Sequence, residues 1–194
     1  MPRNRPRKKP ATSDPLEGLS ISGVARYILD PKHLTTPVSI DPNVRNFCRR
    51  LSPQQPVYLE PSPQPWSRLN FCDRNVQKMI QLNGGEAILG YRIWYVKDIY
   101  IEAERHAVWG DSGGQLTDLS FYPDGERRIL FLPVARLTTV KEETLGRPRA
   151  AFHPKAREFV KIQEMHERAI EVRHLDSWDE WQNAQAYEHW MLEQ

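Results

Sequence analysis

The stretch EAILGYRIWYVKDIYIEAERHAVW, residues 86–109, decides the fold of this 194-residue chain. Two runs rich in β-branched and aromatic residues flank Lys97 and Asp98. This pattern predicts two antiparallel strands joined by a tight turn. Two further β-rich runs follow at 115–121 and 127–134, each after a short connection that contains glycine. We therefore predict an antiparallel β-meander of four strands.

A helix that carries a cysteine is predicted immediately before this sheet. The stretch LNFCDRNVQKMIQLNGG, residues 69–85, aligns four side chains on one helical face: Cys72, Val76, Met79 and Ile80. Asn70 is the expected N-cap, Asp73 lies in the first turn, and NGG at 83–85 is typical of a helix C-terminus. We expect the sheet to pack against this helix, with Cys72 in its opening turn. The predicted fold class is α+β.

The rest of the chain divides into segments of different composition. Residues 1–17 form a basic tail that we expect to be disordered, since five of the first nine residues are Arg or Lys. Residues 18–148 form the α+β domain. Residues 149–194 have helical periodicity and predict a tryptophan-rich extension of two C-terminal helices. The second of these helices begins at the capping-box pattern of Ser177 and Glu180.

Short elements are predicted in the proline-punctuated region between the tail and the cysteine-bearing helix. GVARYIL at 23–29 and VRNFCRRL at 44–51 have the pattern of short helices. PVYLEP at 56–61 has the pattern of a short strand bounded by prolines.

The composition excludes some classes of protein. No run approaches the roughly 18 to 20 apolar residues that a membrane span needs. The basic start is not followed by an apolar stretch, so we expect no secretory signal, no membrane association and a cytoplasmic location. The only two cysteines, Cys48 and Cys72, are too few for a disulfide scaffold. Reduced thiols are the simpler interpretation, and a single bridge is the alternative.

The loop GDSGG, residues 110–114, gives the second predicted hairpin a register. If Trp109 and Gln115 close this loop as an opposed pair, His106 faces Asp118 across the two strands. Opposed side chains of an antiparallel pair lie on one face, with Cβ atoms about 4.5 to 5.5 Å apart. The register therefore predicts a carboxylate beside the imidazole, whereas a slip of one residue would separate the two groups.

Cys72, His106 and Asp118 together have the chemistry of a nucleophilic triad. A helix amino terminus and a nearby imidazolium both stabilise a thiolate. The thiolate would attack an acyl carbon, His106 would transfer the proton, and Asp118 would fix the tautomer of the imidazole. An oxyanion hole would combine the Cys72 backbone N–H with a side-chain donor from the preceding segment, for which the candidates are Trp66, Asn70 and Gln64.

The order of these residues resembles that of a known superfamily. A helix-borne Cys, a following strand with HAVW and then a strand with Asp are similar to the papain-like superfamily in its transglutaminase-like and NlpC/P60-like branches. The blocks GYRIWY, IEAERHAVW, LTDLS and RRILFLP are also similar to those of a family of uncharacterised bacterial proteins. The resemblance covers about residues 66–134. It implies Cys72 as nucleophile, His106 as base and Asp118 as orienting acid.

Three classes of function follow from these features. The first is a cysteine-nucleophile hydrolase or acyltransferase that acts without a cofactor on an amide or isopeptide bond of a protein or peptide. The second is a non-catalytic module that binds protein, nucleic acid or an acidic partner through the basic tail and the tryptophan-rich helices, with Cys72 as a buried structural thiol. The third is a metal-dependent enzyme that uses Glu102, Glu104 and His106 on one strand face. Because the predicted strands supply no second histidine, we predict no metal ligands.

Overall fold

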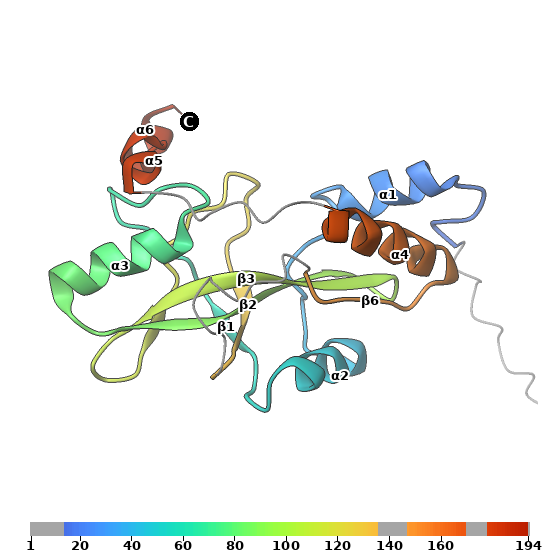
Figure 1. Ribbon diagram of the computed structural model, residues 1–194, viewed down its shortest axis with the longest axis horizontal. Coiled ribbons are helices and arrows are strands. Elements are labelled where there is room, and N and C mark those ends of the chain that lie inside the picture. The colour runs from blue at the N-terminus through green and yellow to red at the C-terminus, as the bar shows by residue number, and fades with distance from the viewer. Residues whose placement is uncertain (1–13, 136–146, 170–177, 194) are drawn as a thin grey trace, which may run out of the picture.

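The computed structural model describes residues 14–135, 147–169 and 178–193 as an α+β fold around one antiparallel sheet (Figure 1). The helices are α1 (Ile21–Leu29), α2 (Pro42–Leu51), α3 (Cys72–Asn83), α4 (Pro154–Ala169), α5 (Trp178–Asn183) and α6 (Tyr187–Leu192). The strands are β1 (Val57–Leu59), β2 (Glu86–Val96), β3 (Tyr100–Gly110), β4 (Leu116–Thr117), β5 (Ile129–Pro133) and β6 (Arg149–Ala151). None of these described helices is long and apolar enough to cross a lipid bilayer.

The long hairpin of β2 and β3 forms the centre of the sheet, as the sequence predicts. The two strands pair along their whole length, from Glu86 opposite Gly110 to Val96 opposite Tyr100. The strand order is β1-β5-β2-β3-β4, and β6 pairs with the beginning of β3. The predicted meander is therefore wrong for its last strand, because β5 does not follow β4 but crosses to the other side of β2. All five residues of β5 are buried, and a two-residue strand such as β4 cannot cover so apolar a neighbour.

Helix α3 packs on the β2–β3 hairpin through the face that its sequence predicts. Val76 and Met79 form an apolar cluster with Ala107 of β3 and Leu119. The partly buried side chains that pack against this cluster are Trp66, Cys72, Ile80, Leu89 and Trp109. The opening residue of α3 therefore lies against the sheet.

The two ends of α3 differ in how well the sequence predicts them. Asn70 is not the N-cap: its φ is 65°, and Phe71 occupies the cap position without a side-chain hydrogen bond. At the other end Gly84 has a φ of 71°, and its N–H donates to the Ile80 carbonyl, as expected of a glycine terminator. Asp73 lies in the first turn, as predicted.

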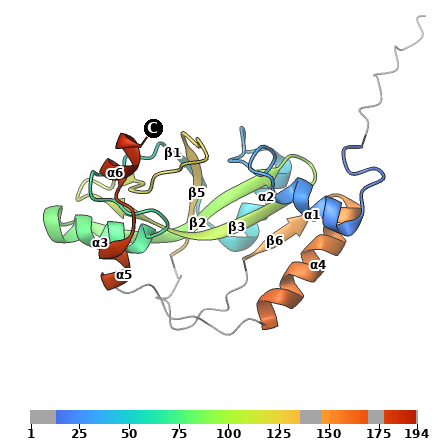
Figure 2. The same cartoon turned by 90° about the horizontal axis from the view of Figure 1, so that it is seen from above.

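The predicted short helices at 23–29 and 44–51 are confirmed as α1 and α2, and the predicted strand at 56–61 contains β1. Helix α2 packs on one face of the sheet, where Val44, Phe47 and Cys48 contact β-strand residues in an apolar cluster. Helices α1 and α4 lie side by side at the end of the sheet where β6 pairs with β3 (Figure 2).

Both predicted outer segments contribute to the body of the fold. Leu16 is fully buried in the cluster formed by α1, α4 and the end of β2, so residues 14–17 do not belong to a disordered tail. Residues 1–13, which carry the basic charges, lie outside the described residues. Arg149 to Ala151, at the start of the predicted C-terminal extension, form β6 and join the sheet.

The second predicted C-terminal helix is broken into α5 and α6. The backbone N–H of Tyr187 donates to the Ser67 carbonyl, and that of Glu188 donates to the Pro65 carbonyl. A continuous helix would direct these N–H groups to carbonyls one turn earlier in the same helix, so the contact with the 65–67 segment replaces helical bonds. Ser177 of the predicted capping box lies outside the described residues.

Candidate active site

His106 and Asp118 lie on the same face of the sheet, as the sequence predicts, but the register differs from the expected one. Trp109 pairs with Thr117 and not with Gln115, so His106 is not directly opposite Asp118. The observed partner of Trp109 lies two residues after the predicted one. Because side chains alternate between the faces of a strand, a register shift of two residues leaves His106 and Asp118 on the same face. The His106 Nε2 atom lies 3.0 Å from Asp118 Oδ1, and both side chains are buried.

A glycine opposite His106 allows the neighbouring strand to approach. Gly90 of β2 is the direct partner of His106. A Cβ atom at position 90 would clash with the Leu132 carbonyl oxygen and lie 2.7 Å from the Phe131 ring. Without that atom, β5 packs closely, and the Phe131 ring contacts the His106 ring edge to face at 6.3 Å between centroids.

Cys72 of α3 reaches the same imidazole. It is half-buried and opens the helix, and its side chain lies close enough to His106 to influence the charge of the ring. Because His106 Nε2 pairs with Asp118, Nδ1 is the ring nitrogen that remains for the thiol. The fold therefore brings together, in one row, three side chains that lie far apart in the sequence: Cys72, His106 and Asp118.

The electrostatics of this row favour a protonated His106. Burial opposes protonation of the ring, but the charges of Asp118 and Cys72 and the hydrogen bonds with both raise the pKa of His106 to about 10. Burial also opposes the charge of Asp118. His106 and the hydrogen bonds from Tyr122 and the Ser120 N–H outweigh this effect and hold the pKa of Asp118 below its usual value. His106 and Asp118 therefore form an ion pair at neutral pH.

No family model, curated protein or solved structure matches this chain. The chemistry of the row therefore rests on its own residues and their geometry.

Cys48 has a different environment from Cys72. Both cysteines are free, and they belong to different apolar clusters. Cys48 is 1% exposed on α2, and burial raises its pKa to about 12. The predicted alternative of a bridge between the two cysteines is not formed.

The three candidate oxyanion donors take different positions before α3. Trp66 packs against the same apolar cluster as Cys72. The Gln64 side-chain amide donates to the Ser62 carbonyl at 3.4 Å. Asn70 is exposed, two residues before Cys72. Of the three, Trp66 is the one that the structure brings into the cluster around the thiol.

Tyr122 belongs to the site but is not predicted from the sequence. Its hydroxyl donates to Asp118 Oδ2 at 2.7 Å and lies 3.5 Å from His106 Nε2. The residue lies in the connection between β4 and β5, where no strand or helix periodicity fixes the direction of a side chain. The spacing of four residues between Asp118 and Tyr122 does not predict a contact in a segment that is neither helix nor strand.

Glu102 and Glu104, which share the face of His106, are engaged elsewhere. Arg147 donates to Glu102 Oε1 at 2.9 Å and to Glu104 Oε1 at 2.6 Å. Trp94 donates to the second oxygen of Glu104. Within the described ranges, no group of three or more His, Cys, Asp or Glu side chains is arranged to hold a metal ion.

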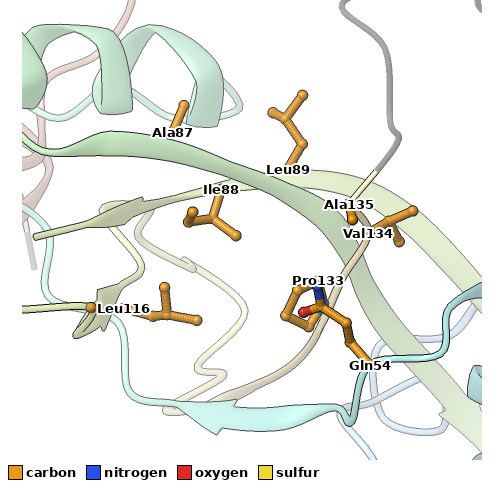
Figure 3. Close-up of a pocket in the computed structure, with 9 residues that line it drawn as sticks. Gln54, Ala87, Ile88, Leu89, Leu116, Pro133, Val134 and Ala135 are labelled. Carbon is orange, nitrogen blue, oxygen red and sulfur yellow. The ribbon is translucent and has the colours of Figure 1, made fainter.

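A shallow cavity of about 420 Å³ lies beside β2. Figure 3 shows Ile88, Leu116 and Pro133 around this space, with Gln54 at its border and Ala87 and Leu89 on the other side of the strand. Cys72, His106 and Asp118 do not line this cavity. Leu89 also packs against the cluster around Cys72, so a single strand separates the cavity from that cluster.

Proposed function

We propose that this protein is a cysteine-nucleophile hydrolase or acyltransferase that acts on an amide or isopeptide bond of a protein or peptide. The observation that carries the proposal is the row in which Cys72 contacts His106 and His106 pairs with Asp118. The order of the row matches the roles that nucleophile, proton carrier and orienting acid need. The resemblance to the papain-like superfamily supports the same assignment.

The chemistry divides into two acyl-transfer steps. The Cys72 thiolate attacks the carbonyl carbon, and the C–N bond breaks when the His106 imidazolium gives its proton to the leaving amine. A water molecule or an acceptor amine then attacks the thioester, and His106 takes its proton while Cys72 leaves as the thiolate. Asp118 holds the ring through Nε2 and balances its positive charge.

The position of Cys72 at the start of α3 suits a thiolate. Phe71 at the N-cap supplies no side-chain hydrogen bond to the first turn. The first N–H groups of a helix and its dipole stabilise a negative charge, and a backbone N–H there can also stabilise an oxyanion. Cys72 and Trp66 pack against the same apolar cluster, which contains Val76.

Alkylation with iodoacetamide across pH tests the proposal. We expect Cys72 to be alkylated selectively, and faster at pH 6 to 7 than a free thiol. Cys48 is an internal control, because its burial should protect it until the protein unfolds. Peptide mass mapping after alkylation separates the two sites.

Variants distinguish a nucleophile from a structural thiol. His106→Gln should slow alkylation at pH 6 to 7 by about tenfold or more, because the thiolate loses its imidazolium partner. Cys72→Ala should abolish labelling of the folded protein. If Cys72 of the unaltered protein reacts no faster than a free thiol, or if His106→Gln leaves the rate unchanged, the thiol is structural and the proposal is wrong.

A further inference from the structure

Three donors satisfy the Asp118 carboxylate, and Tyr122 alone holds its second oxygen within the described part of the chain. Asp118 Oδ1 receives the His106 ring and the Ser120 backbone N–H, each at 3.0 Å. Asp118 Oδ2 receives the Tyr122 hydroxyl at 2.7 Å. Asp118 is completely buried, so water does not compete for these contacts. The Tyr122 hydroxyl therefore stabilises part of the negative charge of the carboxylate that also binds His106.

Arg92 of β2 holds the Tyr122 ring in place. The guanidinium carbon lies 3.8 Å from the centre of the Tyr122 ring and 3.7 Å from the centre of the Trp94 ring. Two rings this close cannot occupy the same face of a planar guanidinium, so Arg92 lies between them. Trp94 is fixed in turn by a hydrogen bond of 2.7 Å from its Nε1 to Glu104.

Two of the three guanidinium nitrogens of Arg92 lack a hydrogen-bond partner within the described residues. The residue is 4% exposed, and its Nε and Nη2 atoms have no hydrogen-bond partner among residues 14–135, 147–169 and 178–193. Buried charged groups are normally hydrogen-bonded, and an unsatisfied one requires an explanation. Stacking on aromatic faces is the stabilising contact that Arg92 does make. Its cation is thus placed beside the Tyr122–Asp118 contact.

We propose that Tyr122, held in place by Arg92, is a positioning residue of this site. Its hydroxyl binds the second oxygen of Asp118 and thereby limits how strongly Asp118 stabilises the protonated form of His106. The inference rests on the proposed function, in which His106 must release that proton to a leaving amine. A carboxylate that receives fewer hydrogen bonds binds a proton more tightly. An acid that holds its proton too strongly is a poor proton donor near neutral pH.

Several charged or titratable groups surround the His106 ring. Cys72 approaches from α3, Asp118 and Tyr122 approach from the segment after β4, and Arg92 approaches from β2 behind Tyr122. Glu104 lies on the same face of β3, but Arg147 and Trp94 occupy its oxygens. Removing the Tyr122 hydroxyl takes one hydrogen bond from Asp118 without adding or removing a formal charge, which makes it the cleanest perturbation.

Titration of the His106 ring by NMR, with nitrogen-15-labelled histidine, tests the inference. Tyr122→Phe keeps the ring that Arg92 stacks on and removes only the hydroxyl. We expect the His106 midpoint to rise by roughly half a pH unit or more. Tyr91→Phe is the matched control, because Tyr91 lies on the same strand as Arg92 and packs in the cluster on the α2 side of the sheet. An unchanged or lowered midpoint in Tyr122→Phe overturns the proposal.

A second substitution tests whether Arg92 holds Tyr122 in place. Arg92→Met should also raise the midpoint, and Arg92→Lys, which keeps the charge but not the planar stack, should give a smaller rise. In the Tyr122→Phe background, Arg92→Met should add less than it does alone, because part of its effect passes through the hydroxyl. Strictly additive shifts would show that Arg92 does not act through Tyr122.

The NMR readout is independent of whether the protein is an enzyme. If Cys72 is unreactive toward iodoacetamide, the proposed function fails, and the His106 titration still reports the hold of Tyr122 on Asp118. If Cys72 is reactive and Tyr122→Phe does not move the His106 midpoint, the function stands and the positioning role is wrong.

Discussion

His106 combines a buried imidazole with a strong preference for its charged form. The residue is 9% exposed, yet Asp118 and Cys72 favour the protonated form of its ring. A histidine whose pKa is higher in the folded state than in the unfolded chain stabilises the fold through the proton that it binds. This contribution is complete below the unfolded pKa of about 6.5 and is lost as the pH rises through the folded value of about 10.

In a Cys72→Ala variant, which has no thiolate in the row to titrate in the opposite direction, the free energy of unfolding should therefore fall as the pH rises from 6.5 to 9. The folded protein binds more protons than the unfolded chain in this range, and the slope should approach roughly 1 kcal/mol per pH unit. Above pH 9 the buried Cys48 thiol adds a second decline, because its pKa is also raised. Urea unfolding at half-unit pH intervals measures the slope.

In the Cys72→Ala background, His106→Gln should flatten this dependence between pH 6.5 and 9, since glutamine can still donate to Asp118 but does not titrate. Cys48→Ala should leave the slope in that range unchanged. A slope that persists in His106→Gln would assign the pH dependence to another group.

At the scale of single elements, one amide ties together α3, the segment before it and α5. Asn75 is completely buried one turn after Cys72. Its Oδ1 accepts from the Arg68 N–H at 2.8 Å and from Trp181 Nε1 at 3.0 Å, and its Nδ2 donates to the Arg68 carbonyl at 2.9 Å. Arg68 also stacks on the Trp181 ring. The start of α3 is therefore fixed by the C-terminal part of the chain.

Asn75→Ala should destabilise the protein by about 3 kcal/mol, because three buried hydrogen-bonding groups lose their partner at once. Asn46→Ala is the matched control. Asn46 lies in the exposed face of α2, where the same change should cost less than about 0.5 kcal/mol. Denaturant unfolding of both variants checks the difference, and equal losses would show that the Asn75 contacts are not coupled to stability.

At the scale of the whole molecule, buried ion pairs join β3, β6 and α4. Arg149 Nε lies 3.3 Å from Glu102, and its two terminal nitrogens each donate to Glu167 at 2.6 Å. The side chains of Arg149 and Glu102 are 6% and 3% exposed. These contacts fasten the segment after residue 147 to the central hairpin, which also carries His106.

Arg149→Met should cost about 3 to 5 kcal/mol, because Glu102 remains buried with one of its two cationic partners removed. Arg157→Met on the exposed face of α4 should have an effect within about 0.5 kcal/mol. The midpoints and slopes of urea unfolding curves measure both. If Arg149→Met lowers the free energy of unfolding no more than Arg157→Met does, the attraction within the ion pairs only offsets the cost of removing their charges from water.

Short-range patterns predicted most of the elements. Alternating β-rich runs predicted the β2–β3 hairpin, and helical spacing predicted the face of α3 that carries Cys72. These predictions succeed because the periods of 2 and 3.6 residues determine which side chains can share a face. The side-chain alternation also placed His106 and Asp118 on one face, although the hairpin closes two residues away from the expected pair.

Contacts between distant segments decided what the sequence could not. The crossing of β5 to β2, the break between α5 and α6, and the places of Tyr122 and Arg92 all depend on side chains and backbone groups far apart in the chain. The sequence by itself determined the central β2–β3 hairpin, the helix face and the three residue types of the row. Only the tertiary structure decided which side chains complete it, because local periodicity fixes direction within an element but not the packing of one element against another.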